Sequence, residues 1–219
     1  MRLESPASPA TLSPGDPRGE ESNRKLSGSQ ARVDVADVST YQSVQISGDT
    51  SQPAAPMKTL LIVYHTMTGG TLQMAQAAAA GAATEPAVRV ALLHAPQAQG
   101  ADVLQADGYI FATPENLAAI SGLMKDFFDR TYYAALDRIN GRPYACLICA
   151  GSDGQNAARQ IERIATGWRL KSVAPALIVC THAQTTEAIL RPKQIDALDL
   201  KRCEELGAAM ATGLGLGIF

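Results

Sequence analysis

The chain has 219 residues, a formal net charge of −2 and 46% hydrophobic residues. It contains 19 Lys and Arg residues and 21 Asp and Glu residues. Five of the basic and seven of the acidic residues lie before Met57, so residues 57–219 carry 14 of each and are formally neutral. A nucleic-acid-binding domain would carry a basic stripe, and a membrane helix would need about 18 consecutive apolar residues. Neither pattern occurs, so we expect neither nucleic acid nor a membrane as a partner.

Residues 1–56 differ in composition from the rest. They hold six of the twelve prolines, many Ser, Gly, Asp and Glu residues, and few apolar ones. Such a stretch cannot bury enough apolar surface to offset its ordering entropy, so we predict a disordered N-terminal extension, 1–56, and a folded domain, 57–219. It has neither the apolar core of a secretory signal nor the acid-poor composition of a transit peptide. Met57 leads straight into the first predicted strand, so natural initiation at Met57 stays open.

Apolar runs with helix-like segments between them make up the rest of the chain. The predicted strands are 59–64, 88–93, 108–113, 144–150 and 174–180. The predicted helices are 73–83, 101–105, 118–136, 156–168 and 193–212. Strands that are apolar on both faces and joined by helical crossovers predict a parallel sheet covered on both sides, an α/β architecture.

The four cysteines are too few and too scattered for a disulfide framework. Cys146 and Cys149 have the spacing of a redox or metal motif, but they lie within the fourth predicted strand. Residues three apart on a strand face opposite sides, so we predict two separate core thiols and a reducing, cytoplasmic compartment. His94 and His182 show no metal-ligand spacing, so no metal site is predicted.

The most informative segment joins the first strand to the first helix. Three threonines and two glycines predict a loop whose N–H groups converge at a helix N-terminus, where a phosphate can dock. No Lys or Arg occurs between Lys58 and Arg89, so amides, hydroxyls and the helix dipole would have to hold it. Neither a Walker A loop nor a Gly-x-Gly-x-x-Gly fingerprint is present. An ordinary turn that caps the helix is the alternative.

The spacing Thr-x-Thr-Gly-x-Thr, from Thr66 to Thr71, resembles the FMN phosphate loop of the flavodoxin-like superfamily. The segment Ser121 to Arg130 is similar to NAD(P)H-dependent FMN reductases and WrbA-like quinone reductases, although Ala119-Ile120 stands where Asn-Met is common. The resemblance covers about residues 58–180. It implies a flavodoxin-like three-layer sandwich with a five-stranded parallel sheet of order 2-1-3-4-5.

The resemblance also implies which residues hold FMN. The loops after the first, third and fourth strands should meet at one edge of the sheet, with the phosphate in the first and the ring between the other two. The predicted cofactor-binding residues are His65, Thr66, Met67, Thr68, Gly69, Gly70, Thr71, Pro114, Glu115, Asn116, Leu117, Ala118, Gly151, Ser152, Asp153 and Gly154. For His65 a purely structural role stays open, as does a plain Asp-Gly turn for the third loop.

The catalytic residue is unknown. Asp153 and Glu115 belong to no paired-carboxylate or triad arrangement, and hydride transfer needs no such group because the cofactor carries the electrons. We expect an NAD(P)H-dependent flavin oxidoreductase that takes NADH or NADPH as donor, reduces a quinone or similar small-molecule acceptor, and forms a homodimer or homotetramer. The alternatives are a non-enzymatic flavodoxin electron carrier and a flavin-free interaction protein that uses its apolar end, 214–219.

Overall fold

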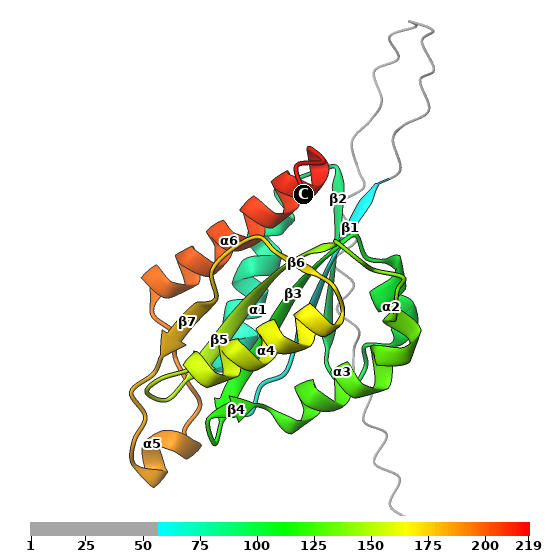
Figure 1. Ribbon diagram of the computed structural model, residues 1–219. Helices are drawn as coiled ribbons and strands as arrows, with labels where there is room; N and C mark the ends of the chain where they lie inside the picture. The colour runs from blue at the N-terminus through cyan, green and yellow to red at the C-terminus, as the bar shows by residue number, and fades with distance from the viewer. Residues whose placement is uncertain (1–56) are drawn as a thin grey trace, which may run out of the picture. The chain divides into compact units, whose positions relative to one another are not determined.

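The computed structural model describes residues 57–219 (Figure 1); the disorder predicted for residues 1–56 lies outside the described residues. The strands are β1 (Lys58–Tyr64), β2 (Val88–His94), β3 (Gly108–Asn116), β4 (Ala119–Ile120), β5 (Pro143–Ala150), β6 (Lys171–Ser172) and β7 (Leu177–Cys180). The helices are α1 (Gly70–Ala82), α2 (Gly100–Gln105), α3 (Gly122–Ala135), α4 (Gln155–Gly167), α5 (Thr186–Leu190) and α6 (Ala197–Gly215).

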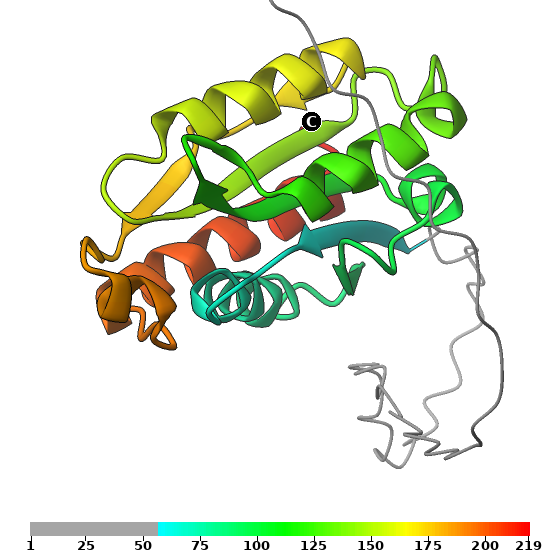
Figure 2. The ribbon, with the colours of Figure 1, turned by 90° about the horizontal axis from the view of Figure 1, so that it is seen from below.

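A parallel sheet forms the centre, with β2, β1, β3 and β5 as consecutive neighbours. Both β6 and β7 pair with β5, at its start and at its end, so together they form one interrupted edge strand. With these two counted as one strand, the order is the predicted 2-1-3-4-5. Helices α1 and α6 cover one face, and α2, α3 and α4 cover the other (Figure 2). The prediction of a flavodoxin-like three-layer sandwich is confirmed.

The strands are apolar on both faces because each face supports its own core. Leu60 and Ile62 belong to the core under α1 and α6, whereas Leu61 and Val63 belong to the opposite core. Cys146 and Cys149 divide in the same way, so their sulfurs diverge as predicted. Burial raises the pKa of Cys146 to about 12 and also raises the pKa of Cys149, so both remain protonated thiols near neutral pH.

Helices α1 and α6 cross with their backbones in contact. A Cβ at Gly207 would lie 1.9 Å from the carbonyl oxygen of Ala78, and a Cβ at Gly81 would lie 1.9 Å from that of Glu204. Only glycine permits so close an approach at both points. This crossing positions α1, and therefore the loop that precedes it.

Strand β3 is longer than predicted, and Pro114 does not end it. The strand runs on to Asn116 and turns back as a short hairpin with β4. Ala112 accepts a hydrogen bond from His65 N (3.0 Å), so its polar groups face β1. Backbone polar groups alternate in direction along a strand, so an N–H at position 114 would point to that same side. Because β1 has already ended there, the missing N–H of Pro114 costs the sheet no hydrogen bond.

The starts of α3 and α6 also differ from the prediction, and the structure contains one helix that was not predicted, α5. Helix α3 begins at Gly122 and not at residue 118, because the intervening residues form the hairpin. Helix α6 begins at Ala197, after the Asp196 carboxylate has accepted a hydrogen bond from Leu198 N (2.8 Å). The segment before it contains α5, which the apolar periodicity did not reveal because none of its five residues is buried.

Among residues 57–219, no helix combines the length and the apolar character that crossing a membrane requires.

The glycine crossing generates the first prediction. Gly207→Ala should lower the free energy of unfolding by at least about 1 to 3 kcal/mol, because a methyl group cannot fit against the α1 backbone. Gly167→Ala is the matched control: it also lies in a helix, and a Cβ there meets no atom within 4 Å. Its unfolding free energy should stay the same or rise by up to about 1 kcal/mol. Urea denaturation measures both, and equal effects would contradict the crossing.

Candidate functional site

The three predicted loops leave β1, β3 and β5, which are neighbours in the parallel sheet, so all three lie beyond the same edge. The β4 hairpin and α5 lie at this edge (Figure 1). In doubly wound sheets this carboxyl edge is where ligands bind.

The first loop leads from the end of β1 into the start of α1. Gly69 has a φ of 87°, a left-handed conformation that glycine adopts without strain, and its N–H donates to Thr66 Oγ1 (3.0 Å). No side chain caps the helix and its first turn carries no acidic residue. The helix N-terminus therefore remains able to interact with a negatively charged group.

A segment far away in the sequence supports this loop. We call residues 181–196, between β7 and α6, the strap. Lys193 N donates to Thr68 O (2.8 Å). Gln73 holds the strap twice, since its Nε2 donates to Lys193 O (2.7 Å) and its Oε1 accepts from Ile195 N (3.2 Å). Sequence reasoning missed this arrangement, because no local pattern links Gln73 to residues about 120 positions later.

The strap also brings a cation toward a loop that has none of its own. The Lys193 ammonium donates to the carbonyls of Ala188, Ile189 and Arg191, at 2.8, 2.8 and 2.7 Å, which stabilises the end of α5. Its charge acts on the neighbouring Cys149, where it opposes the rise in pKa that burial causes. Lys193 thus contributes positive potential near the loop, although its ammonium group donates its hydrogen bonds to carbonyls of the strap itself.

The second loop is the hairpin between β3 and β4. Leu117 and Ala118 at its tip have φ values of 51° and 57°, the paired left-handed conformation of a type I′ turn. Neither is glycine, so the turn is strained, and Leu117 is fully exposed. Below the tip, buried Ser121 donates its N–H to Thr113 Oγ1 (3.1 Å), which closes the base of the hairpin.

The third loop is bound to the second. Gly154 N donates to Glu115 Oε2 (2.8 Å), and Asn156 Nδ2 donates to the carbonyl of Ala118. Gly154 has a φ of 82°, and a Cβ there would lie 2.5 Å from Ile178 Cγ2. Ser152 and Asp153 are exposed, and Gly151 is half-buried. Glu115 is therefore a structural link between the two loops.

Three buried side-chain atoms among the described residues make no hydrogen bond: His65 Nδ1, Thr71 Oγ1 and Glu115 Oε1. All three belong to the predicted site residues. The Thr71 hydroxyl has only the Cys149 thiol, a weak partner, beside it. Leaving a buried polar atom unpaired costs about 1 to 3 kcal/mol, so all three atoms can serve as hydrogen-bond partners of a ligand at this edge.

His65 lies at the junction of β1 and the first loop, stacked on His94 with ring centroids 5.5 Å apart. Burial, and secondarily the His94 charge, lower the pKa of His65. Burial also lowers the pKa of His94. Both rings are therefore neutral near pH 7, and His65 can carry its proton on either nitrogen to suit a ligand.

The structure thus places every predicted site residue at the carboxyl edge, and it joins the second and third loops directly. Contact of these residues with a cofactor stays a prediction. The strap residues Gln73 and Lys193 are additions that the sequence did not suggest.

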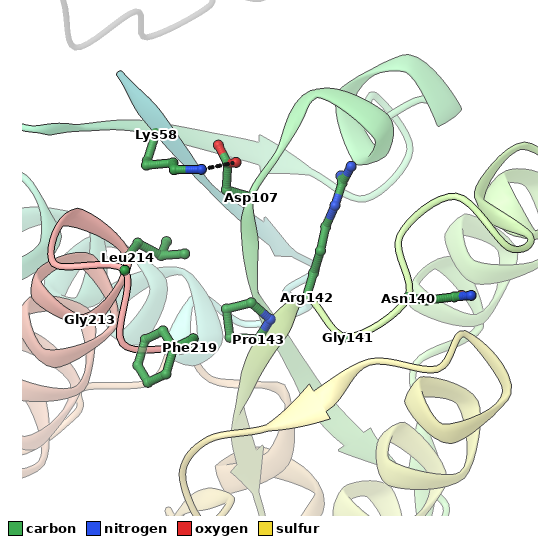
Figure 3. Close-up of a pocket in the computed structure, with 10 residues that line it drawn as sticks. Lys58, Asp107, Asn140, Gly141, Arg142, Pro143, Gly213, Leu214 and Phe219 are labelled. Atoms are coloured by element: carbon green, nitrogen blue, oxygen red, sulfur yellow. Dashed lines mark hydrogen bonds and ion pairs between the residues drawn. The ribbon is translucent and has the colours of Figure 1, made fainter. Parts of the chain in front are cut away.

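A separate hollow of about 250 Å³ lies at the opposite edge, where the strands begin (Figure 3). Its charged groups already have partners: Lys58 Nζ donates to Asp107 Oδ1 (3.1 Å), and Arg142 donates to the carbonyls of Leu104 and Ala106 at the end of α2. These contacts stabilise strand and helix ends, so we assign this hollow no ligand.

Comparison with known proteins agrees with this geometry. Residues 57–184 match the NADPH-dependent FMN reductase family. The chain belongs to this family. It is 35% identical over 98 residues to a flavodoxin of Aquifex aeolicus, covering 45% of this chain and 53% of that protein. It is 35% identical over 95 residues to an NAD(P)H dehydrogenase (quinone) of Acidithiobacillus ferrooxidans, covering 34% of this chain and 48% of that protein. The chain thus spans about half the length of these curated relatives.

Solved structures show the same fold. A flavodoxin from the domain Archaea superposes with a TM-score of 0.59 at 18% identity, covering 71% of this chain and 98% of that one. A WrbA-like flavodoxin from Agrobacterium tumefaciens gives 0.57 at 20% identity, with coverages of 73% and 98%. At these identities the likeness concerns the fold of this FMN reductase family member.

The stacked pair of His65, which is buried, and His94, which is half-buried, predicts how stability depends on pH. The pKa of His65 is lowered from its ordinary 6.5, so the unfolded chain binds more protons than the folded one as pH falls below that value. The melting temperature of the ligand-free protein should therefore be level above pH 6.5 and decline below it.

His65→Gln should make this decline shallower, whereas His182→Asn, at an exposed position, should leave it unchanged. Thermal melts followed by circular dichroism between pH 5 and about 8 measure the slope. An identical slope for His65→Gln and the unchanged protein would show that His65 does not contribute.

Proposed function

We propose that this protein binds FMN at the carboxyl edge and uses NADH or NADPH to reduce a quinone or similar small molecule. The observation that carries the proposal is the set of three unpaired buried atoms, His65 Nδ1, Thr71 Oγ1 and Glu115 Oε1. His65 directly follows β1, Thr71 lies in the first turn of α1, and Glu115 lies near the end of β3. Together they suit a ligand with an anionic end and a polar ring. Membership of the NADPH-dependent FMN reductase family supports the same cofactor.

The first loop suits the phosphate end of FMN. The N–H groups at the start of α1 and the hydroxyls of Thr66, Thr68 and Thr71 would donate to its oxygens, together with His65. Bonds from Gln73 and Lys193 hold the loop in place before the ligand arrives, which reduces the entropy that binding would otherwise cost.

The second and third loops suit the ring. Small residues, Gly151 and Gly154, allow the backbone to approach a flat ligand closely. The unpaired Glu115 Oε1 can accept a hydrogen bond from an N–H of the ring while Oε2 remains on Gly154 N. Asn156 bonds to the strained turn at Leu117 and Ala118 and fixes its position. The tip of the turn is exposed, so the hairpin can border a ring.

When bound, FMN would supply the redox chemistry, namely hydride acceptance from NAD(P)H and two-electron transfer to a quinone, which would take up two protons to become the hydroquinone. The protein's residues bind, orient and shield. No side chain at the edge forms an acid–base pair, which agrees with a reaction that needs none. Because donor and acceptor would use the same ring in turn, the kinetics should be ping-pong.

We further propose that the enzyme is a cytoplasmic homodimer or homotetramer in which a neighbouring subunit helps to complete the acceptor site. The second candidate function is that of an electron carrier, which the 35% identity to a flavodoxin supports. The formal neutrality of residues 57–219 favours the enzyme, because a carrier gains its association rate from a charged face.

Thr68→Val together with Thr71→Val should weaken FMN binding. Each change removes a hydrogen bond to a charged phosphate, worth about 1.5 to 3 kcal/mol, so affinity should fall by at least about 2 kcal/mol. Flavin fluorescence quenching on titration of the ligand-free protein measures it. Thr212→Val, at an exposed position of α6, is the control. Unchanged affinity in the double variant would show that the loop does not hold the phosphate.

Anaerobic mixing with stoichiometric NADH or NADPH tests the enzymatic function. The visible absorbance of protein-bound FMN should bleach within the mixing experiment, and a quinone added afterwards should restore it. A flavin that is bound but not bleached by either nucleotide would favour the electron carrier. Protein that stays colourless after incubation with FMN would contradict both functions.

A further inference from the structure

A groove of about 480 Å³ runs beside the hairpin and is lined by residues of β4, the start of α3 and α4. Its apolar part is formed by Ile120 and Ile164, and its polar rim includes Lys125, Arg159 and Arg163. This volume lies in the range that small-molecule sites occupy. Of its lining residues, the flavin proposal uses Asn156, which bonds to the hairpin.

Arg159 and Arg163 distinguish the groove from the rest of the surface. They lie four residues apart on α4, so their side chains leave the same side of the helix. Both are exposed, and within residues 57–219 neither forms an ion pair or donates a hydrogen bond, whereas Lys125 on the opposite rim is paired with Asp129 (2.6 Å). Two guanidinium groups without an acidic partner beside an apolar floor provide a site for an anion that carries a flat, apolar part.

The groove begins where the proposed ring site ends. Asn156, in the first turn of α4, bonds to the Ala118 carbonyl, and Gln160 Oε1 accepts from Ile120 N (2.8 Å). Helix α4 is thus held against the hairpin. With a rise of 1.5 Å per residue, Arg159 lies about 4.5 Å and Arg163 about 10 Å further along the axis than Asn156. A ligand that extends from the hairpin along α4 would meet the two arginines in succession.

We propose that this groove binds the adenosine half of NADPH, with Arg159 and Arg163 holding the phosphate monoester on its ribose and the apolar floor facing its base. This inference rests on the proposed function, because the nicotinamide end must reach the flavin. A guanidinium binds a phosphate by two parallel hydrogen bonds, and a terminal phosphate monoester carries more charge than a bridging diester. The subsite therefore favours NADPH, whose extra phosphate is a monoester on the adenosine ribose, over NADH.

The charge of the groove argues for a small anion and not for a second copy of this chain. Residues 57–219 are formally neutral, and an isologous contact at this groove would bring Arg159 and Arg163 of two copies toward each other. Like charges brought together in this way oppose association. A subunit contact here remains a measurable outcome of the experiment below.

The test uses FMN-loaded protein with Arg159→Gln and Arg163→Gln combined. The matched control combines Arg138→Gln and Lys171→Gln, which removes two exposed cations near the start of β5, at the opposite edge of the sheet. Steady-state reduction of a quinone gives KM and kcat for both nucleotides. Calorimetric titration with adenosine 2′,5′-bisphosphate measures binding without any redox step, and sedimentation velocity gives the oligomeric state.

The groove variant should raise the KM for NADPH about 10-fold or more and weaken adenosine 2′,5′-bisphosphate similarly, since one charge-assisted hydrogen bond is worth about this factor. Its KM for NADH should change by less than about threefold, since NADH lacks the monoester. Its kcat, and every parameter of the control variant, should be unchanged. Equal KM values for NADPH in the groove variant and the unchanged enzyme would overturn the inference, as would a groove variant whose main change is its oligomeric state.

The two proposals fail differently. If the unchanged protein binds FMN but neither nucleotide reduces it, the proposed function is wrong. If NADH or NADPH reduces the unchanged protein, but the groove variant has the same KM values as the control variant, the enzymatic function stands and the adenosine subsite is wrong.

Discussion

A buried polar atom without a partner is costly, and this requirement organises the carboxyl edge of the sheet. Where β1 and β3 end, their loops can no longer bond to neighbouring strands, so other groups must take over. Gln73, Asn156 and Glu115 do so for the strap, the hairpin and the third loop. His65 Nδ1, Thr71 Oγ1 and the second carboxylate oxygen of Glu115, Oε1, are left over. The first two lie beside the N-terminus of α1, and this combination suggests a bound anion.

The scaffold behind the edge is rigid for a reason that lies far from the site. Gly81 and Gly207 allow α1 and α6 to cross in backbone contact, which leaves little freedom for α1 to tilt. The first loop is continuous with α1, and the strap is continuous with α6. The same crossing therefore sets both sides of the contact between Thr68 and Lys193. A site that requires fixed N–H groups benefits from a helix whose position is so narrowly determined.

Local sequence patterns predicted much of the fold and of the site. Strands apolar on both faces, the Thr-Gly loop and the opposite orientations of Cys146 and Cys149 all follow from periodicity or backbone chemistry within a few residues. The errors arose where longer-range pairing decided the outcome. Pro114 continues β3 because β1 has already ended, and residues 118–121 leave the expected helix because Thr113 and Ser121 close a hairpin. Neither fact is visible without knowing which strands are neighbours.

The sequence by itself determined the fold class, the strand-to-helix loop and the kind of ligand chemistry that such a loop permits. These depend on hydrophobic period and on glycine and threonine at particular positions, which are local properties. Only the tertiary structure decided that Lys193 and Gln73 brace that loop, that Glu115 joins two loops, and that Arg159 and Arg163 line one groove beside the hairpin. Such relations depend on segments separated by tens of residues, and packing of the whole sheet and its helices is what brings them together.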